Sequence, residues 1–368
     1  MAATQHRKDI QGLRALAVLL VVAGHLFPTV VKGGFIGVDI FFVISGFVIT
    51  QQMLKSYLTA QKGFLLNFYS RRIRRILPSA LLVTVVSIWA THIFLGPVAS
   101  NNATLDGGWA TVFLSNFHFH NIALDYFATG TQPSVLQHYW SLSIEEQFYL
   151  IWPALFVLVF FKAISLRTRQ ILIVLVIALS LSTAMHQSLI NQSPIFFSTW
   201  TRIWELAVGA LTAITSKTIQ LPRFALSTLL TLIGLSAFVI DQTMQWPRLT
   251  TIPIIAATGI VLLRNPRLGS FWLLENKVAT YIGDLSYIIY LWHWPVLTIT
   301  KGYYGKLGGS EILMVIVITA LLSVATHHLF ENPLRYSKAL SAKPALTVSV
   351  GVVAIAATAT TLFTNYQG

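Results

Sequence analysis

The chain has 368 residues, of which 55% are hydrophobic and only 10% are charged, and its formal net charge is +13. A soluble domain carries about 25% charged residues, so too little polar surface is present to enclose a soluble globule. The positive charge does not favour nucleic-acid binding, because the basic residues lie in short runs between apolar segments. The absence of cysteine excludes disulfides, thiolate metal sites and an acyl-cysteine intermediate, and no metal is expected.

Eleven apolar stretches approach the length of about 20 residues that a bilayer-spanning helix needs. The sequence therefore predicts an all-α, polytopic transmembrane helix bundle of about 11 spans. The eighth stretch is short and the ninth is rather polar. The expected spans are Leu13–Val31, Gly34–Leu54, Leu77–Val98, Tyr139–Phe161, Ile171–Gln187, Ile195–Ser216, Phe224–Ile240, Thr250–Leu263, Val278–Thr300, Ile312–Phe330 and Ala345–Phe363.

The distribution of Lys and Arg predicts the topology. Nineteen of these residues fall in the loops on one side of the predicted spans, against four on the other: Lys32, Arg248, Lys301 and Lys306. Cytoplasmic loops are enriched in Lys and Arg, so we expect a cytoplasmic N-terminus and an extracytoplasmic C-terminus. No cleavable signal peptide is expected before the first span.

Two segments do not fit the pattern of ordinary spans. The basic segment Ser56–Ile76 alternates Lys and Arg with apolar residues, which is typical of a helix lying on the membrane surface. The segment Ala99–His138 has no Lys or Arg but several aromatic residues, and we expect it to form an ordered external lid.

Arg14 and His25 lie within the first apolar stretch. Their eleven-residue spacing turns a helix by about 1100 degrees, so both side chains share one face about 16 Å apart. Ionisable groups at bilayer depth cost about 2.5 to 3.5 kcal/mol each and usually mark a functional path. We expect Arg14 to bind phosphate or carbonyl oxygen and His25 to act as a general base. The structural alternative is a snorkelling arginine and a hydrogen-bonded core histidine.

Asp39 and Ser45 follow on the second stretch, among glycines that permit close helix packing. Because the connection after the first stretch is short, Asp39 is expected at roughly the depth of His25. A carboxylate there can orient the imidazole and stabilise its protonated form. Packing alone is the competing explanation.

Further polar residues lie on later stretches. Glu145 and Tyr149 are four residues apart and so share a helical face, and at least one of the glutamates 145 and 146 must point into the bundle. Arg202 and Glu205, three residues apart, are interpreted as a structural ion pair.

These motifs together resemble the acyltransferase-3 family of bacterial integral membrane proteins. The resemblance rests on the Arg14/His25 pair, GGFIGVDIFFVISGFVIT, RRIRRILP, YWSLSIEEQFYLIWP, RIWELAVGA, LSYIIYLWHWP and FENPLR, which cover nearly the whole chain in family order. It is closest to the subgroup in which an eleventh span leads to an external SGNH-type domain. Residues 1–340 are thus expected to form the ten-helix acyltransferase domain, and 341–368 the eleventh span and the start of a linker to such a domain.

The resemblance implies acyl transfer from cytoplasmic acyl-CoA, most often acetyl-CoA, to a hydroxyl of a lipid-linked or surface polysaccharide such as lipopolysaccharide O-antigen. It implies that Arg14 and His25 are essential and that Arg71, Arg72, Arg74 and Arg75 handle the donor, to whose phosphates these arginines can give charge-assisted contacts. The catalytic set expected is His25, Asp39, Arg14, Glu145 and Tyr149. The alternatives are a transporter or flippase of a lipid-linked saccharide, without covalent chemistry, and a scaffold for an external domain.

Overall fold

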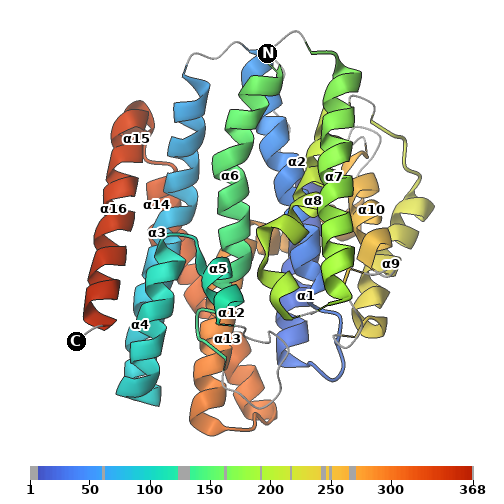
Figure 1. The fold of residues 1–368 in the computed structure, drawn as a ribbon. Helices are drawn as coiled ribbons and strands as arrows, with labels where there is room; N and C mark the ends of the chain where they lie inside the picture. The colour runs from blue at the N-terminus through green and yellow to red at the C-terminus, as the bar shows by residue number, and fades with distance from the viewer. Residues whose placement is uncertain are drawn as a thin grey trace. The chain divides into compact units, whose positions relative to one another are not determined.

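The computed structural model describes residues 7–59, 63–122, 133–160, 164–190, 193–215, 218–241, 246–247, 251–264 and 271–366, and its named elements are all helices (Figure 1). The long helices are α1 (Lys8–Leu26), α2 (Ile36–Leu58), α3 (Phe64–Leu95), α4 (Pro97–Thr111), α6 (Tyr139–Phe160), α7 (Leu166–Ser188), α8 (Thr199–Ile214), α9 (Arg223–Val239), α10 (Thr251–Leu262), α12 (Lys277–Tyr304), α13 (Gly309–Thr326) and α16 (Pro344–Tyr366). Short elements are α5 (Ser115–Asn121), η1 (Ser193–Phe197), α11 (Trp272–Glu275), the π-helix η3 (His327–Glu331), α14 (Asn332–Arg335) and α15 (Lys338–Ala342).

The chain forms two compact units. Unit 1 comprises Met1–Lys55 and Phe148–Ser286, and unit 2 comprises Ser56–Gln147 and Tyr287–Gly368. Helices α2, α6 and α12 contribute residues to both. Each unit therefore joins segments that are distant in the sequence.

Glycines bring the helices of unit 1 unusually close together. A Cβ atom added to Gly24 of α1 would lie 2.8 Å from the Cα of Gly34, which directly precedes α2. Between α2 and α8, a Cβ on Gly46 would lie 1.9 Å from the Leu206 carbonyl oxygen, and one on Gly209 would lie 2.0 Å from that of Val43. These contacts require glycine, since real Cβ atoms do not approach backbone oxygens so closely. They fix α1, α2 and α8 against one another.

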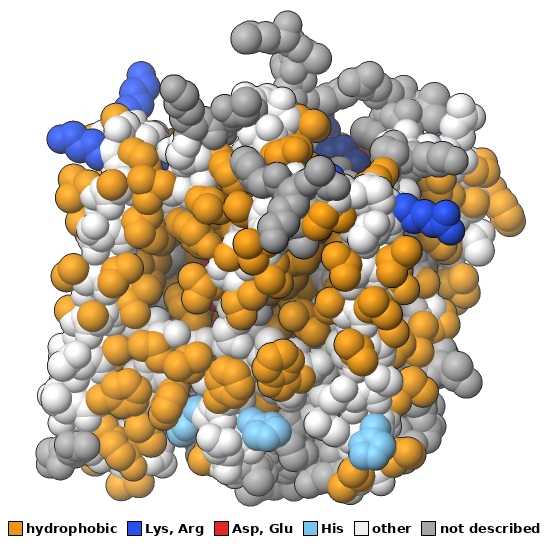
Figure 2. Space-filling model, turned by 45° about the horizontal axis from the view of Figure 1, so that its top comes forward, with side chains coloured by type: hydrophobic (Ala, Val, Ile, Leu, Met, Phe, Trp, Pro, Cys, Tyr) orange, Lys and Arg blue, Asp and Glu red, His pale blue; other side chains and the backbone are white. Residues whose placement is uncertain are grey.

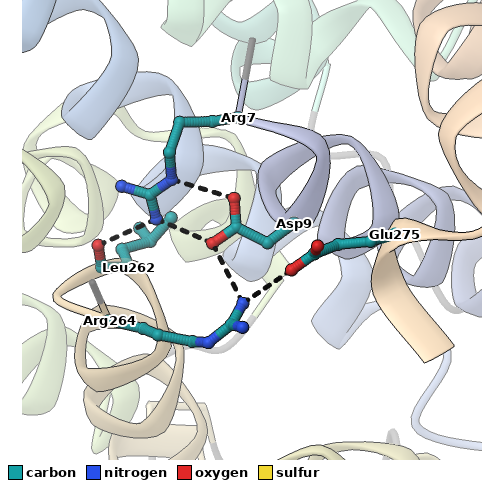
Figure 3. Close-up of polar contacts among 5 residues, drawn as sticks. All are labelled: Arg7, Asp9, Leu262, Arg264 and Glu275. Carbon is teal, nitrogen blue, oxygen red and sulfur yellow. Dashed lines mark hydrogen bonds and ion pairs between the residues drawn. The ribbon is translucent and has the colours of Figure 1, made fainter. Parts of the chain in front are cut away.

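An ion-pair network joins three segments of unit 1 (Figure 3). Arg7 contacts both carboxylate oxygens of Asp9 at 2.8 and 2.9 Å and donates to the Leu262 carbonyl at 3.2 Å. Arg264 lies 2.8 Å from Glu275 and 3.7 Å from Asp9. Two arginines thus balance two carboxylates, and the network ties the start of α1 to the end of α10 and to α11.

In unit 2, α16 packs against α3 and α4, and the three helices lie side by side (Figure 1). The Phe363 ring, near the end of α16, meets the Trp109 ring of α4 edge-on at 5.7 Å. Helices η3 and α14 also pack against α3. α3 is therefore the central helix of this unit.

Each expected apolar stretch overlaps a helix in its described residues, and the all-helical prediction is confirmed for the described part of the chain. Six helical segments there are long and apolar enough to cross a membrane: α1, α2, α3, α7, Gly309–Ala342 and α16. Two shorter apolar helices are α9 and α10. In the space-filling view hydrophobic side chains cover much of the visible face, and few Lys or Arg side chains appear (Figure 2). The count of eleven spans and the orientation of the termini stay predictions.

Two expectations about the connecting segments were wrong. Residues 64–76 are not a separate surface helix, because α3 runs without a break from Phe64 past Pro78 to Leu95. Gly63, at a φ of 63°, makes the turn that precedes it. The segment Ala99–His138 is also less of a loop than expected, since it holds most of α4 and all of α5; its residues 123–132 lie outside the described part of the chain.

The glycine contacts give a prediction for stability. Gly209→Ala should destabilise unit 1 by about 1 to 3 kcal/mol, the usual cost of overpacking, because its new Cβ meets a backbone oxygen. Gly234→Ala is the matched control: nothing lies within 4 Å of its Cβ position in α9, and alanine is the better helix former. Apparent melting temperatures in detergent should fall for the first variant and hold or rise for the second. Equal temperatures would refute the tight α2–α8 contact.

Candidate functional site

Arg14 and His25 lie on one uninterrupted helix, α1, as the sequence predicts. Both side chains are half-buried, and Arg14 Nη1 donates to Gln11 Oε1 at 3.3 Å. His25 lies in the last turn of α1, directly after Gly24. The close approach of Gly24 to Gly34 therefore holds the His25 backbone against the beginning of α2. The catalytic roles of both residues stay predictions.

Asp39 belongs to a buried charge cluster in unit 1. Its Oδ1 accepts a hydrogen bond from Arg202 Nη2 at 2.6 Å, and Arg202 Nη1 lies 3.3 Å from Glu205 Oε1. All three side chains are at most 1% exposed. One guanidinium thus faces two carboxylates in a water-excluded site, where attraction between opposite charges is strong and the loss of one partner is costly.

Aromatic rings enclose the guanidinium of Arg202. Its Cζ lies 4.3 Å from the ring centroid of Trp246, 5.1 Å from that of Phe42 and 5.7 Å from that of Phe196. Cation–π attraction is greatest where water is excluded. The site is therefore built around Arg202, with α2 and α8 each contributing charges.

The expected pairing of Asp39 with His25 is not observed. Asp39 Oδ1 is taken by Arg202, and Oδ2 has no hydrogen-bond partner among the described residues. The expected ion pair of Arg202 with Glu205 is confirmed, but the sequence did not indicate that Asp39 completes it. The reason is that Asp39 and Arg202 are 163 positions apart and meet only through the glycine contacts of α2 and α8.

The four arginines of α3 lie in unit 2 and differ in their surroundings. Arg71 is exposed, Arg72 and Arg75 are half-buried, and Arg74 is buried. The Arg72 guanidinium lies 5.7 Å from the centroid of the Phe68 ring. Arg72 and Arg75 both attract the carboxylate of Glu146. The first turns of α3 therefore form a basic cluster with an acidic counterpart on α6.

Of the residues expected on α6, Glu145 is half-buried in unit 2 and Tyr149 is buried in unit 1. Its neighbour Glu146, which was not among the expected site residues, is attracted by Arg72 and Arg75. Ser45 of α2 is half-buried. The roles of Glu145 and Tyr149 stay predictions.

A histidine–carboxylate pair of unit 2 was missed. His118 Nε2 lies 2.8 Å from Asp106 Oδ1, and Ser134 Oγ contacts the other oxygen of Asp106. The Trp109 ring stacks on the His118 imidazole at 5.5 Å. These contacts tie α4, α5 and the residues before α6 together. No spacing rule joins them, so sequence reasoning had no signal for them. Within the described residues, no group of three or more His, Asp and Glu side chains could hold a metal ion.

Comparison with known proteins identifies the family. The model of an acyltransferase domain, that of acyltransferase-3, matches residues 7–328. The chain belongs to this family. It is a multi-pass protein of the bacterial cytoplasmic membrane. No solved structure matches it.

Named relatives are O-acetyltransferases. The chain is 36% identical over 350 residues to the peptidoglycan O-acetyltransferase OatA of Listeria monocytogenes, covering 89% of this chain and 55% of the relative. It is 31% identical to the O-acetyltransferase OatA of Staphylococcus aureus, covering 91% and 58%. The putative peptidoglycan O-acetyltransferase YrhL of Bacillus subtilis is 30% identical, covering 90% and 56%. The chain thus spans little more than half the length of these relatives.

The Arg202 cluster leads to a prediction about Asp39. Asp39→Asn should lower the stability of the folded protein as well as its activity, because removing one partner of a buried pair costs about 3 to 5 kcal/mol. Arg202→Met should cost more, since it leaves two carboxylates without their cation. Asp241→Asn, which breaks the exposed Lys32 pair at 3.1 Å, is the control and should cost less than about 1 kcal/mol. A normal melting temperature for Arg202→Met would contradict the role assigned to the cluster.

Proposed function

We propose that the chain transfers an acyl group, in the first instance acetyl, from cytoplasmic acyl-CoA to a hydroxyl of a cell-envelope polysaccharide. Membership of the acyltransferase family over residues 7–328 carries this proposal. The shared face of Arg14 and His25 on unbroken α1 supports it, because it gives the bundle an anion-binding group and a proton acceptor along one line.

The donor is handled at the basic cluster of α3. Arg71, Arg72 and Arg75 present guanidinium groups that can bind the phosphates of CoA through charge-assisted hydrogen bonds. The carboxylate of Glu146 attracts Arg72 and Arg75. The loops of this side hold most of the lysines and arginines, which supports a cytoplasmic position for the cluster.

His25 is the general base of the transfer. Its imidazole takes the proton of the acceptor hydroxyl as the oxygen attacks the thioester carbonyl carbon. The carbon–sulfur bond then breaks, the acyl group stays on the oxygen, and the CoA thiolate takes up the proton. Arg14, about 16 Å away along α1, binds the donor nearer the cytoplasmic end of the helix. Asp39 contributes through the packing of α2 against α8.

The acceptor is a polysaccharide outside the cytoplasm. Two of the three relatives are named for peptidoglycan, and none for lipopolysaccharide. Peptidoglycan is therefore the first acceptor to examine, and O-antigen, which the family resemblance suggested, is the second. An SGNH-type domain outside residues 1–368 stays a proposal.

The first experiment measures ester-linked acetate on both polysaccharides, by mass, in cells that express the chain. His25→Ala should lower acetylation by about 100- to 10,000-fold, the usual cost of losing a general base, with normal amounts of protein in the membrane. His186→Ala, which changes an exposed histidine in the last turn of α7, should be silent. Full acetylation by His25→Ala would exclude the assigned role, and saccharide movement without acetylation would favour a transporter.

A second experiment concerns the donor. Changing Arg71, Arg72 and Arg75 to glutamine should weaken binding of acetyl-CoA to purified protein, because three cations that can contact phosphate are lost. Arg167→Gln with Arg223→Gln removes exposed arginines at the starts of α7 and α9 and should leave affinity unchanged. Equal affinity in the triple variant and the wild type, measured by calorimetry, would rule out phosphate binding at this cluster.

A further inference from the structure

Arg74 is set apart from the other arginines of α3 by its contacts. Its side chain is 8% exposed. Nη1 donates to the carbonyl oxygens of Arg335 at 3.0 Å and Ser337 at 3.4 Å and to the hydroxyl of Ser341. Nε points back to the Ser70 carbonyl of its own helix at 3.4 Å. The guanidinium is therefore already occupied by protein acceptors.

The three acceptors of Arg74 Nη1 all belong to the segment after the π-helix. Arg335 ends α14, Ser337 caps α15 by accepting a hydrogen bond from the Leu340 amide, and Ser341 lies within α15. Ser341 also donates to the Ser337 carbonyl at 2.8 Å. One side chain of α3 thus holds the turn between two short helices, neither of which is long enough to be stable by itself.

The same segment is linked to a buried histidine. Arg335 Nη1 donates to Glu331 Oε1 at 3.3 Å, and Glu331 Oε2 lies 2.8 Å from His327 Nδ1. Glu331 is 3% exposed and His327 is 9% exposed. Glu331 thereby fixes the plane of the imidazole, and for the other ring nitrogen, Nε2, no partner lies in the described part of the chain. The pair spans η3, and π-helical turns occur frequently at functional sites.

We propose that Arg74 is a positioning residue and not a ligand of the donor's phosphates. It fixes the turn after α14 and, through Arg335 and Glu331, holds the imidazole of His327 with Nε2 directed away from its carboxylate. His327 is then a polar group of the donor site, on the helix η3 that packs against α3, the helix of Arg71, Arg72 and Arg75. This inference rests on the proposed function only in naming acyl-CoA as the ligand.

The two roles for Arg74 make opposite predictions for Ser341. A phosphate ligand would be unaffected by Ser341→Ala, which changes no charge. A positioning residue loses an acceptor, so Ser341→Ala should reproduce part of the effect of Arg74→Gln. Arg74→Lys also separates the two roles. A phosphate ligand should tolerate this change, because the ammonium keeps the positive charge. A positioning residue should not, because the ammonium lacks the planar guanidinium that bonds to several acceptors.

The experiment has an arm that needs no donor. Because the chain has no cysteine, Lys338→Cys gives a single exposed site for a spin label on α15. Arg74→Gln and Ser341→Ala should each increase label mobility in the ligand-free protein, and Arg72→Gln should not. Unchanged mobility in Arg74→Gln would overturn the positioning role, whether or not the protein binds acyl-CoA.

The second arm measures acetyl-CoA turnover in membranes. Arg74→Gln should lower it by about 10- to 100-fold, the range for hydrogen bonds lost from a charged group, and Arg74→Lys should not rescue it. Adding Ser341→Ala or His327→Gln to Arg74→Gln should lower acetyl-CoA turnover no further than Arg74→Gln does alone. Ser182→Ala, on the exposed side of α7, is the silent control.

Two results would overturn the proposal and restore Arg74 as a phosphate ligand. One is that Ser341→Ala and His327→Gln each lower turnover further when added to Arg74→Gln, and the other is normal turnover in Arg74→Lys. If the wild type shows no acetyl-CoA turnover while the spin label still responds to Arg74→Gln, the proposed function is refuted. The positioning role of Arg74 is then still supported.

Discussion

Pairing of charge inside an apolar bundle is the constraint on which this structure depends. A guanidinium or carboxylate that is removed from water needs a partner of opposite charge and several hydrogen bonds. Arg202 is paired with Asp39 and Glu205, and three aromatic rings enclose it. Arg7 and Arg264 meet that requirement with Asp9 and Glu275. Both clusters join helices that are far apart in the sequence.

The same requirement separates arginines that stabilise the fold from those that are open to a ligand. Arg202 and Arg74 are buried and bonded to protein groups, whereas Arg71 is exposed and Arg72 and Arg75 are half-buried. A sequence motif treats Arg71 and Arg74 as equivalent because both fit the same spacing. Helical geometry makes them different, since three residues advance a helix by about 300 degrees and place the two side chains over different neighbours.

Much of the fold could be predicted because the length of an apolar stretch depends only on residues adjacent in the sequence. Each expected apolar stretch overlaps a helix, from α1 to α16. The errors came where local signals were weak: α3 continues through its basic turns, and α4 is helical although its sequence is rich in polar residues. The site was predicted less completely. Arg14 and His25 share α1, as their spacing requires. The partner of Asp39, by contrast, depends on the packing of α2 against α8, and the attraction of Glu146 to Arg72 and Arg75 depends on how α6 packs in unit 2.

The most direct test is transfer of labelled acetate across the membrane. Inverted membrane vesicles that contain the chain expose the cytoplasmic face to added acetyl-CoA carrying a ¹³C-labelled acetyl group. The account predicts that the label becomes ester-linked to polysaccharide on the enclosed side and that free CoA accumulates outside in equal amount. Release of CoA without labelled polysaccharide, or no consumption of donor by vesicles that contain the folded protein and an acceptor, would contradict it.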